Sequence, residues 1–291
     1  MDLESLSIFR TVVHEGGILK AARKLHRVPS SVTTRIQQLE ASLGAELFHR
    51  DRQRLHLSPR GQVLLEYADR LLSLSDEARQ AVVGGAPSGV LRIGALESTT
   101  ASRLPAVLAA YHRRYPEVRV ELSTGTNDAL LAALQARRID AAFIVEAPAD
   151  RSLATMPLFR EQLGIISAVS HSPIVRPQDV QDDSVISFPD GCAYRRVLMR
   201  WLGDRRVASV RILELSSYHA IVACVAAGTG VALVPQAVLA TLRSPPVLWH
   251  ALPKVHAERV TPLVWRAGEV PPALAALQAV LQASLRLAEP A

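Results

Sequence analysis

The sequence predicts an α/β protein in three parts: an N-terminal winged helix-turn-helix, a long linker helix, and a doubly wound α/β domain of two lobes. Two observations favour this fold class. A hydroxyl-rich helix follows two short helices near the N-terminus, and strand and helix patterns alternate after residue 90. The chain has 291 residues, of which 49% are apolar. This is enough for two or three packed units and excludes a disordered chain.

The composition indicates a soluble protein of a reducing compartment. Two cysteines cannot build a disulfide framework, and the N-terminus, with Asp2 and Glu4, lacks the basic-then-apolar run of a signal peptide. The uncharged stretch 220–242 is broken by glycines and by Pro235, so a buried helix, a turn and a buried strand explain it better than a membrane span. We therefore expect a cytoplasmic protein that does not contact a membrane.

Positive charge is concentrated at the N-terminus. The net charge is +6, and residues 1–60 hold ten Arg and Lys against six Asp and Glu. A basic segment of this kind indicates a polyanion as partner. The indication is weak by itself, because many soluble surfaces are mildly basic.

Residues 1–44 have the pattern of three helices. The first ends at Gly16-Gly17, and the second carries Ala21 and Ala22, whose small side chains would let another helix cross closely. The third begins at Pro29, which suits the first turn of a helix. Apolar residues recur at helical spacing in the first and third helices: Leu6, Phe9 and Val13, then Val32, Ile36, Leu39 and Leu43.

The other faces of the third helix are rich in short hydroxyls and amides. Such groups hydrogen-bond phosphates and base edges when the N-terminus of a helix enters the major groove of DNA. The alternative is a solvated polar face, but Glu, Lys and Ala would fill such a face better. The candidate DNA-binding residues of this helix are Ser30, Ser31, Thr33, Thr34, Arg35 and Gln38.

A basic hairpin follows the third helix. Leu47, Leu55 and Leu57 anchor it, and three arginines lie at or near its tip. Beside a helix-turn-helix this pattern predicts a wing that contacts the DNA backbone or the minor groove, rather than an ordinary charged hairpin. The candidate residues are Arg50, Arg52 and Arg54.

A long helix is expected from Pro59 to about Val83, and a Gly-rich linker follows at 84–89. Apolar residues in this helix recur at alternating spacings of three and four, which is a heptad seam. A helix with such a stripe outside both domains indicates a dimer interface. The interface candidates are Leu64, Tyr67, Leu71, Leu74 and Ala78.

Taken together, these motifs resemble those of the LysR-type transcriptional regulators. The resemblance rests on Ala21-Ala22, Leu25, Val32, Ile36, the run "LEASLGAELFHR" at 39–50 and "LSPRG" at 57–61. Gly17 stands where the family commonly has Ser at a helix N-cap. Pro29 stands where it often has a DNA-contacting Gln, so Thr33, Thr34 and Arg35 would carry more of the base readout.

The resemblance implies a regulator that binds double-stranded promoter DNA as a homodimer or homotetramer, with RNA polymerase as a candidate partner. It also implies a small-molecule effector bound between two lobes similar to those of periplasmic binding proteins. The predicted boundaries are 1–58 for the DNA-binding domain, 59–88 for the linker helix and hinge, and 89–291 for the effector domain. Lobe I would comprise about 89–160 and 262–291, and lobe II about 161–261.

Candidate effector-binding residues follow strands or begin helices, where ligands of open α/β sheets bind. Helix capping is the alternative for the hydroxyls, and an ion pair with Asp190 is the alternative for Arg195, which we expect to hold an anionic effector. A structural role is the alternative for His219, and a redox role for Cys192 is less favoured than a place in the pocket wall. The candidates are Ser98, Thr99, Thr100, Thr126, Cys192, Tyr194, Arg195 and His219.

Two other functions compete with transcriptional regulation. The α/β half could be an enzyme, but the sequence has no G-x-S-x-G, Walker, H-E-x-x-H or Rossmann glycine motif and no cluster of metal ligands. It could also be a small-molecule binding protein with no role in transcription, which the N-terminal motifs oppose. We therefore expect a regulator that is not an enzyme, with neither a cofactor nor a metal site.

Overall fold

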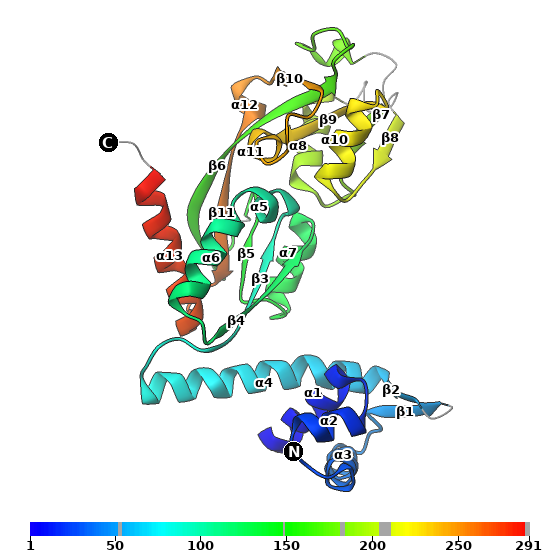
Figure 1. Ribbon diagram of the computed structural model, residues 1–291, viewed down its shortest axis with the longest axis vertical. Helices are drawn as coiled ribbons and strands as arrows, with labels where there is room; N and C mark the ends of the chain where they lie inside the picture. Colours follow the sequence, from blue (N-terminus) through cyan, green and yellow to red (C-terminus); the bar gives the residue numbers. More distant parts are fainter. Residues whose placement is uncertain (52–53, 148, 181–183, 204–210, 289–291) are drawn as a thin grey trace. The chain divides into compact units, whose positions relative to one another are not determined.

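The computed structural model describes residues 1–51, 54–147, 149–180, 184–203 and 211–288 (Figure 1). The chain forms two compact units, Met1–Gly89 and Val90–Ala291. Within the described ranges, none of the helices combines the length and the apolar character that a bilayer crossing requires.

Unit 1 begins with three helices: α1 (Leu3–Glu15), α2 (Ile18–Lys24) and α3 (Pro29–Leu43). The Asp2 carboxylate caps α1 by accepting from the Ser5 backbone N–H at 2.8 Å, and Gly16 and Gly44 end α1 and α3 in the left-handed conformation. Most of the predicted apolar stripes are buried in one core. Leu43, expected in the stripe of α3, is instead 39% exposed, because the helix ends there and the chain turns away at Gly44.

The wing consists of β1 (Phe48–Asp51) and β2 (Arg54–Leu57), which pair antiparallel. The 25-residue helix α4 (Pro59–Val83) follows, and it packs against α1. Ser58 explains the "LSPRG" motif: its hydroxyl accepts from the Gly61 N–H at 2.9 Å and donates to the Glu46 carbonyl at 2.8 Å. Gly61 lies so close to the wing that a Cβ there would be 2.2 Å from the Leu47 carbonyl oxygen.

Unit 2 contains two lobes built on one sheet, which has nine strands among the described residues. The order is β4-β3-β5-β11-β6-β9-β7-β8, and β10 pairs with β6. The crossing strands β6 (Leu153–Ala168) and β11 (Glu258–Arg266) pair antiparallel and run from one lobe into the other (Figure 1). The predicted boundary between the lobes, near residue 161, thus falls inside the 16-residue strand β6.

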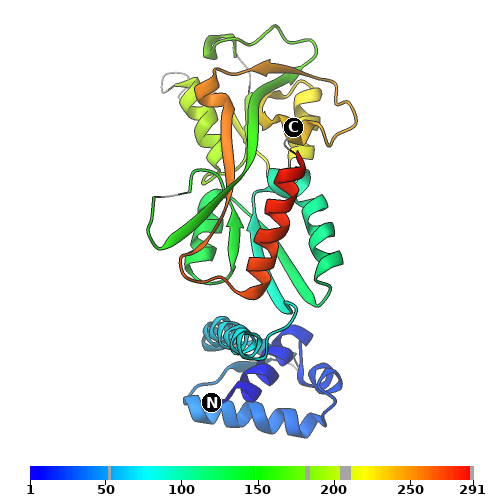
Figure 2. The ribbon, with the colours of Figure 1, turned by 90° about the vertical axis from the view of Figure 1, so that its left-hand side faces the viewer.

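Lobe I contains three strands and four helices of the described chain. Its first two helices, Glu97–Ser102 and Leu104–Arg114, are separated at Arg103. Helices α6 and α13 lie side by side on one face of the lobe I sheet (Figures 1 and 2). The elements are β3 (Gly89–Ala95), β4 (Val118–Thr124), β5 (Ala141–Phe143), α5 (Glu97–Ser102), α6 (Leu104–Arg114), α7 (Asn127–Gln135) and α13 (Pro272–Ala288).

Lobe II contains the remaining strands and short helices. Its apolar core is continuous with residues of lobe I such as Leu96, Leu130 and Ile144, so the lobes meet along a packed seam. The elements are η1 (Pro177–Asp179), β7 (Ser184–Ser187), α8 (Ala193–Leu202), β8 (Arg211–Glu214), α10 (Tyr218–Ala226), β9 (Gly230–Pro235), α11 (Gln236–Leu239), β10 (Val247–Ala251) and α12 (Lys254–Ala257).

Candidate nucleic-acid interface and interlobe site

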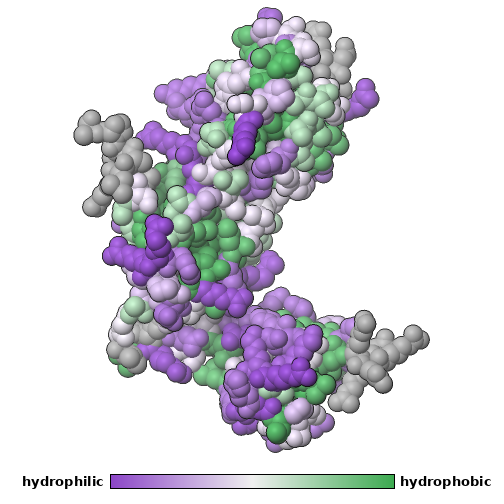
Figure 3. Space-filling model, viewed as in Figure 1, coloured by the Kyte–Doolittle hydropathy of each residue, from purple (hydrophilic) through white to green (hydrophobic). Residues whose placement is uncertain are grey.

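The polar residues predicted on α3 lie at its first turns and outer face. Ser30, Thr34 and Gln38 are exposed, whereas Ser31 and Thr33 are half-buried. The Thr33 hydroxyl donates to the Pro29 carbonyl at 2.9 Å. Hydrophilic side chains predominate over the three short helices on the face seen in Figure 3. This surface can donate and accept hydrogen bonds along a duplex groove.

Arg35 has acidic partners that the sequence pattern did not predict. Its guanidinium donates to the Glu4 carboxylate at 2.7 Å and lies 4.0 Å from Asp2. The same Glu4 carboxylate pairs with Arg27. Two arginines of the helix-turn-helix are thus held by the start of α1, about 30 residues earlier in the chain. DNA would have to compete with these carboxylates for Arg35.

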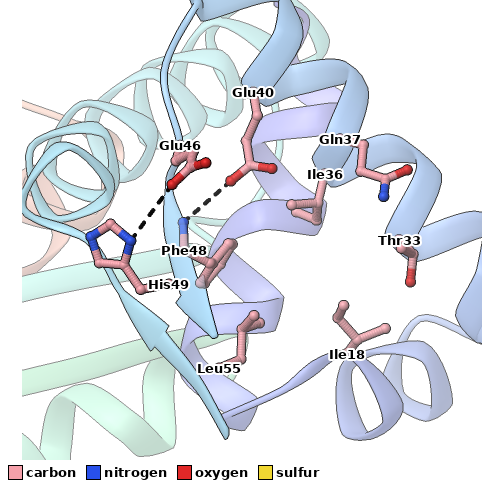
Figure 4. A pocket seen from close by; sticks show the side chains of 9 residues that line it. All are labelled: Ile18, Thr33, Ile36, Gln37, Glu40, Glu46, Phe48, His49 and Leu55. Atoms are coloured by element: carbon pink, nitrogen blue, oxygen red, sulfur yellow. Dashed lines mark hydrogen bonds and ion pairs between the residues drawn. The ribbon is translucent and has the colours of Figure 1, made fainter. Parts of the chain in front are cut away.

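The wing is attached to α3 by one carboxylate. Glu40 Oε1 accepts from the backbone N–H of Leu47 at 2.7 Å and of Phe48 at 3.2 Å (Figure 4). His49 lies 3.7 Å from Glu46 at the outer edge of the same region. A groove of about 540 Å³ separates α3 from the wing, and its lining is Ile18, Thr33, Ile36, Gln37, Glu40, Glu46, Phe48, His49 and Leu55 (Figure 4).

Two of the three arginines predicted on the wing lie in its described strands. Arg50 is the third residue of β1, opposite Leu55, and Arg54 is the first residue of β2, opposite Asp51. Arg52 lies outside the described residues. Their contact with DNA stays a prediction.

Helix α4 presents apolar side chains to solvent. Tyr67 is 53% and Leu74 61% exposed, and Leu71 and Ala78 are exposed as well. Leu64 differs from the prediction, because it is half-buried and packs into the core of unit 1 with Ala68 and Leu72. The exposed apolar face also includes two residues that the heptad pattern missed, Val63 and Val82.

The predicted hydroxyls of lobe I lie at the seam and are mostly buried. Ser98 and Thr99 are buried in α5, while the Thr100 hydroxyl donates to the Leu96 carbonyl at 3.1 Å. Thr126 caps α7 by accepting from the Ala129 N–H at 3.3 Å. The capping alternative therefore fits Thr126, Thr100 bonds back to the carbonyl four residues before it within α5, and Ser98 and Thr99 face the interior.

Cys192 and Tyr194 begin α8 and are both buried. Burial raises the pKa of the Cys192 thiol, although nearby backbone N–H groups partly oppose the shift. A raised pKa disfavours the thiolate and therefore a redox role. Burial also raises the pKa of Tyr194 far above the ordinary value for a phenol, so its hydroxyl keeps its proton. The two side chains form part of the wall between the lobes.

Arg195 forms the ion pair that was the alternative to an anion clamp. It lies 3.1 Å from Asp190 and donates to Glu214 at 2.5 Å and to the Phe188 carbonyl at 3.1 Å. Its side chain is only 13% exposed. Two carboxylates of its own lobe therefore occupy the guanidinium, and the expectation of an anionic ligand at Arg195 has no support in this geometry.

Charged contacts join the lobes at positions that the sequence did not single out. Arg196 on α8 lies 3.2 Å from Asp128 on α7, and Arg200 donates to Glu146 at 2.8 Å. The Asp128 N–H also donates to the Gly191 carbonyl at 3.4 Å. Single acidic residues such as Asp128 in the first turn of α7 and Glu146 after β5 carry no local signal, and only the tertiary structure brings them opposite α8.

Glu97 is a second such residue. Its Oε1 accepts from the Tyr218 N–H at 3.4 Å, so it links the start of α5 to the start of α10 across the seam. Burial raises the pKa of Glu97, opposed by the Tyr218 N–H and by His219. The predicted His219 is exposed. Across the described part of the chain, no three His, Cys, Asp or Glu side chains group as metal ligands would.

Both parts of the chain match models of one protein family. Residues 3–62 match the model described as "Bacterial regulatory helix-turn-helix protein, lysR family", and residues 84–286 match the LysR substrate binding domain. The chain belongs to the LysR family of transcriptional regulators. This LysR-family protein is therefore a DNA-binding regulator with an effector-binding domain, and the enzyme alternative is set aside.

Curated relatives support the same assignment. The chain is 36% identical over 242 residues to the transcriptional regulator GltR of Bacillus subtilis, which covers 83% of this chain and 82% of GltR. It is 36% identical over 256 residues to the regulator YofA of Bacillus velezensis, covering 87% and 88%. The matches extend over most of the length of both regulators.

Solved structures share the fold of the full chain. Full-length OxyR from Pseudomonas aeruginosa superposes with a TM-score of 0.72 at 22% identity, covering 99% of this chain and 95% of that one. CbnR, a LysR-family transcriptional regulator, superposes with a TM-score of 0.68 at 23% identity, covering 98% and 99%. The LysR-family chain thus has the same succession of helix-turn-helix, linker helix and two-lobed domain.

Proposed function

We propose that this LysR-family regulator binds promoter DNA as a homo-oligomer and that a small molecule held between the lobes of unit 2 modulates this binding. The observation that carries the proposal is the pairing, within unit 1, of an exposed hydroxyl- and amide-rich face on α3 with an exposed apolar face on α4. RNA polymerase at the regulated promoter is a further proposed partner. We place the regulator in the cytoplasm, because the proposed partner is promoter DNA.

Recognition of DNA is assigned to α3 and the wing. Ser30, Thr34 and Gln38 are exposed and chemically suited to base edges and phosphates in the major groove. The wing arginines Arg50, Arg52 and Arg54 would neutralise phosphates, which makes affinity fall with salt. A structure of CbnR complexed with its target DNA superposes on this chain with a TM-score of 0.69.

Dimer formation is assigned to α4. Tyr67, Leu71, Leu74 and Ala78 are exposed along a helix, and burying them against a second copy would remove apolar surface from water. A dimer also places two copies of α3 about a two-fold axis. Half-sites about one turn of DNA apart, ~10 bp, or a multiple of this, are then expected.

Binding of an effector is assigned to the seam between the lobes. Support comes from Ser98, Thr99 and Tyr194, which are buried polar residues contributed by both lobes. Apolar residues of both lobes pack into one continuous core across the seam, so the lobes are closed on each other. An effector that binds there would stabilise one arrangement of the lobes over another.

The test is DNA binding by the full chain, measured by fluorescence anisotropy. The probes are a labelled fragment from upstream of the chain's own gene and an unrelated fragment of equal length. Thr34→Ala combined with Gln38→Ala should reduce the preference for the upstream fragment. Arg50→Ala should instead weaken binding to both fragments and flatten the salt slope by about one unit. Equal affinity of the wild-type chain for both fragments across the salt series would contradict sequence-specific recognition.

A further inference from the structure

Buried polar atoms without a hydrogen-bond partner gather at the seam between the lobes. The hydroxyls of Tyr194 and Thr261 and the Oε2 atom of Glu97 are all inaccessible to solvent and, among the described residues, have no partner within bonding distance. Tyr194 is 4% and Thr261 0% exposed. An unsatisfied buried polar atom destabilises a protein, because it has lost its bonds to water without replacement, so three of them near one seam require an explanation.

The three atoms come from separate elements that converge. Glu97 begins α5, Tyr194 lies in the first turn of α8, and Thr261 is on the crossing strand β11. The Tyr194 hydroxyl lies near the hydroxyls of Thr261 and Ser98 without completing a bond to either. Tyr218, whose N–H binds Glu97, lies near both Tyr194 and Ser98. Ser98 and Tyr218 therefore connect the Glu97 end of the seam with the Tyr194 end.

The guanidinium groups that face this seam are already neutralised. Arg103, between α5 and α6, donates to both carboxylate oxygens of Glu161 at 2.9 and 3.1 Å. On α8, Arg195 is paired with Asp190 and Glu214, and Arg196 with Asp128. Each arginine named here has a carboxylate partner, so none of them is available to an incoming anion without breaking an ion pair.

Glu97 is in the opposite situation. Its one hydrogen-bond partner among the described residues is the Tyr218 N–H at 3.4 Å, a long bond, its second oxygen has none, and the nearest imidazole that acts on its charge, His219, is exposed. A carboxylate accepts hydrogen bonds only, and hydroxyl oxygens can accept as well. The three arginines named above thus have carboxylate partners, whereas Glu97 and the hydroxyls of Tyr194 and Thr261 have acceptor oxygens without a donor. A ligand that supplies N–H donors and positive charge complements the seam.

We propose that the effector of this regulator is a small primary amine, and that Glu97, Tyr194 and Thr261 accept hydrogen bonds from it where the two lobes meet. The proposal rests on the effector role assigned to the seam. The ammonium group binds at Glu97, where charge and donors are needed most. A second hydrogen-bonding group of the ligand reaches the hydroxyls of Tyr194 and Thr261. Binding stabilises the closed lobes because the three acceptors come from both lobes and from a crossing strand.

Matched ligand pairs test the class of effector. The melting temperature of the full chain is measured with butylamine and butyrate, benzylamine and benzoate, and 1,4-diaminobutane and succinate. Each pair shares a carbon skeleton and differs in its charged group. We expect at least one amine to raise the melting temperature and its partner carboxylate to leave it unchanged. Shifts with the carboxylates alone, or no shift with any amine, overturn the proposal of an amine. Shifts with the carboxylates would still support an effector site.

Three variants test the residues by calorimetric titration with the amine that gives the largest shift. Glu97→Gln should weaken its binding by about tenfold or more, because a charge-assisted bond is lost. Glu117→Gln, at an exposed carboxylate just before β4, is the control and should leave the affinity unchanged. Equal affinity of the wild-type chain and Glu97→Gln for the amine overturns the role of Glu97.

Tyr194→Phe and Thr261→Val separate binding from structure. Each removes a hydroxyl without a partner and keeps the shape of the side chain, so the melting temperature without ligand should stay the same or rise. The affinity for the amine should fall by about fivefold or more in each. A lower melting temperature with unchanged affinity would show that these hydroxyls serve the fold alone, and would overturn their assignment to the ligand.

Discussion

Replacing Glu40 tests whether one carboxylate holds the wing to the recognition helix. Glu40→Ala removes the acceptor of the Leu47 and Phe48 N–H groups, at 2.7 and 3.2 Å. Hydrogen bonds to a charged acceptor stabilise by about 1.5–3 kcal/mol each. Glu40 is half-buried and the second bond is long, so we expect a loss of about 2 kcal/mol for the pair. Unit 1 should remain folded, because domains are stable by about 5–15 kcal/mol.

Calorimetry of the full chain measures this loss in the transition of unit 1. A domain of under 100 residues loses about 4–8 °C per kcal/mol, so Glu40→Ala should lower this transition by about 8–16 °C. Glu40→Gln keeps an acceptor oxygen and loses the charge, so its transition should lie between those of Glu40→Ala and the wild type. Glu66→Ala, an exposed carboxylate on α4, is the control and should change the transition by little.

DNA binding gives the second measurement for Glu40. A detached wing no longer directs its arginines to phosphates, so Glu40→Ala should weaken binding and flatten the dependence of affinity on salt. If Glu40→Ala melts with the wild type and keeps the wild-type salt slope, the carboxylate does not hold the wing. If Glu40→Gln is as unstable as Glu40→Ala, the charge of the carboxylate matters more than the acceptor geometry.

Three other perturbations address α4, the start of α1, and lobe II. Leu74→Asp should dissociate the oligomer at micromolar concentration and leave the single chain folded, because Leu74 is 61% exposed there; an unchanged sedimentation coefficient would exclude α4 as the main interface. Glu4→Gln should free Arg35 for DNA, raise the affinity at low salt and steepen the salt slope by about one unit; a loss of affinity would show that Glu4 instead positions the arginine. Burial lowers the pKa of His250, whose Nδ1 accepts from the Ile174 N–H at 3.1 Å. The stability that neutral His250 contributes is therefore present above about pH 6.5 and is lost as the pH falls through the lowered pKa. Urea denaturation at pH 7 and pH 5 should show a larger loss for the wild type than for His250→Gln, and equal losses would remove His250 from the pH response.

The sequence by itself determined the helix-turn-helix, because its signals are local. Pro29 begins α3, Gly44 ends it, and apolar residues three and four apart form its buried face. The "LSPRG" run is likewise a local device, in which Ser58 caps the turn and only Gly fits at Gly61 beside the Leu47 carbonyl. Each of these features depends on groups within about a dozen residues of one another, and spacing along the chain reports such groups directly.

The partners of the charged residues were decided by the tertiary structure. Arg35 on the polar face of α3 and Arg195 in the first turn of α8 both looked available for anions, yet Glu4 and Glu214 neutralise them. The role of Glu97 was also hidden, since its partner Tyr218 lies 121 residues away. The strength of a side-chain pair depends on how close the two groups lie in the folded protein. Neither periodicity nor local spacing in the sequence reveals that distance.

The crossing strands show the same limit for the fold. Alternation of strands and helices predicted two α/β lobes, but the predicted boundary near residue 161 falls inside the 16-residue β6. Its first half carries exposed residues beside Leu158, which is buried in the lobe I core, so its apolar pattern is weaker than that of its buried second half. Hydrophobic patterning reports burial within a lobe. Where a strand leaves one lobe to enter the other, the pairing partner holds it in place, and that partner is about 100 residues further along the chain.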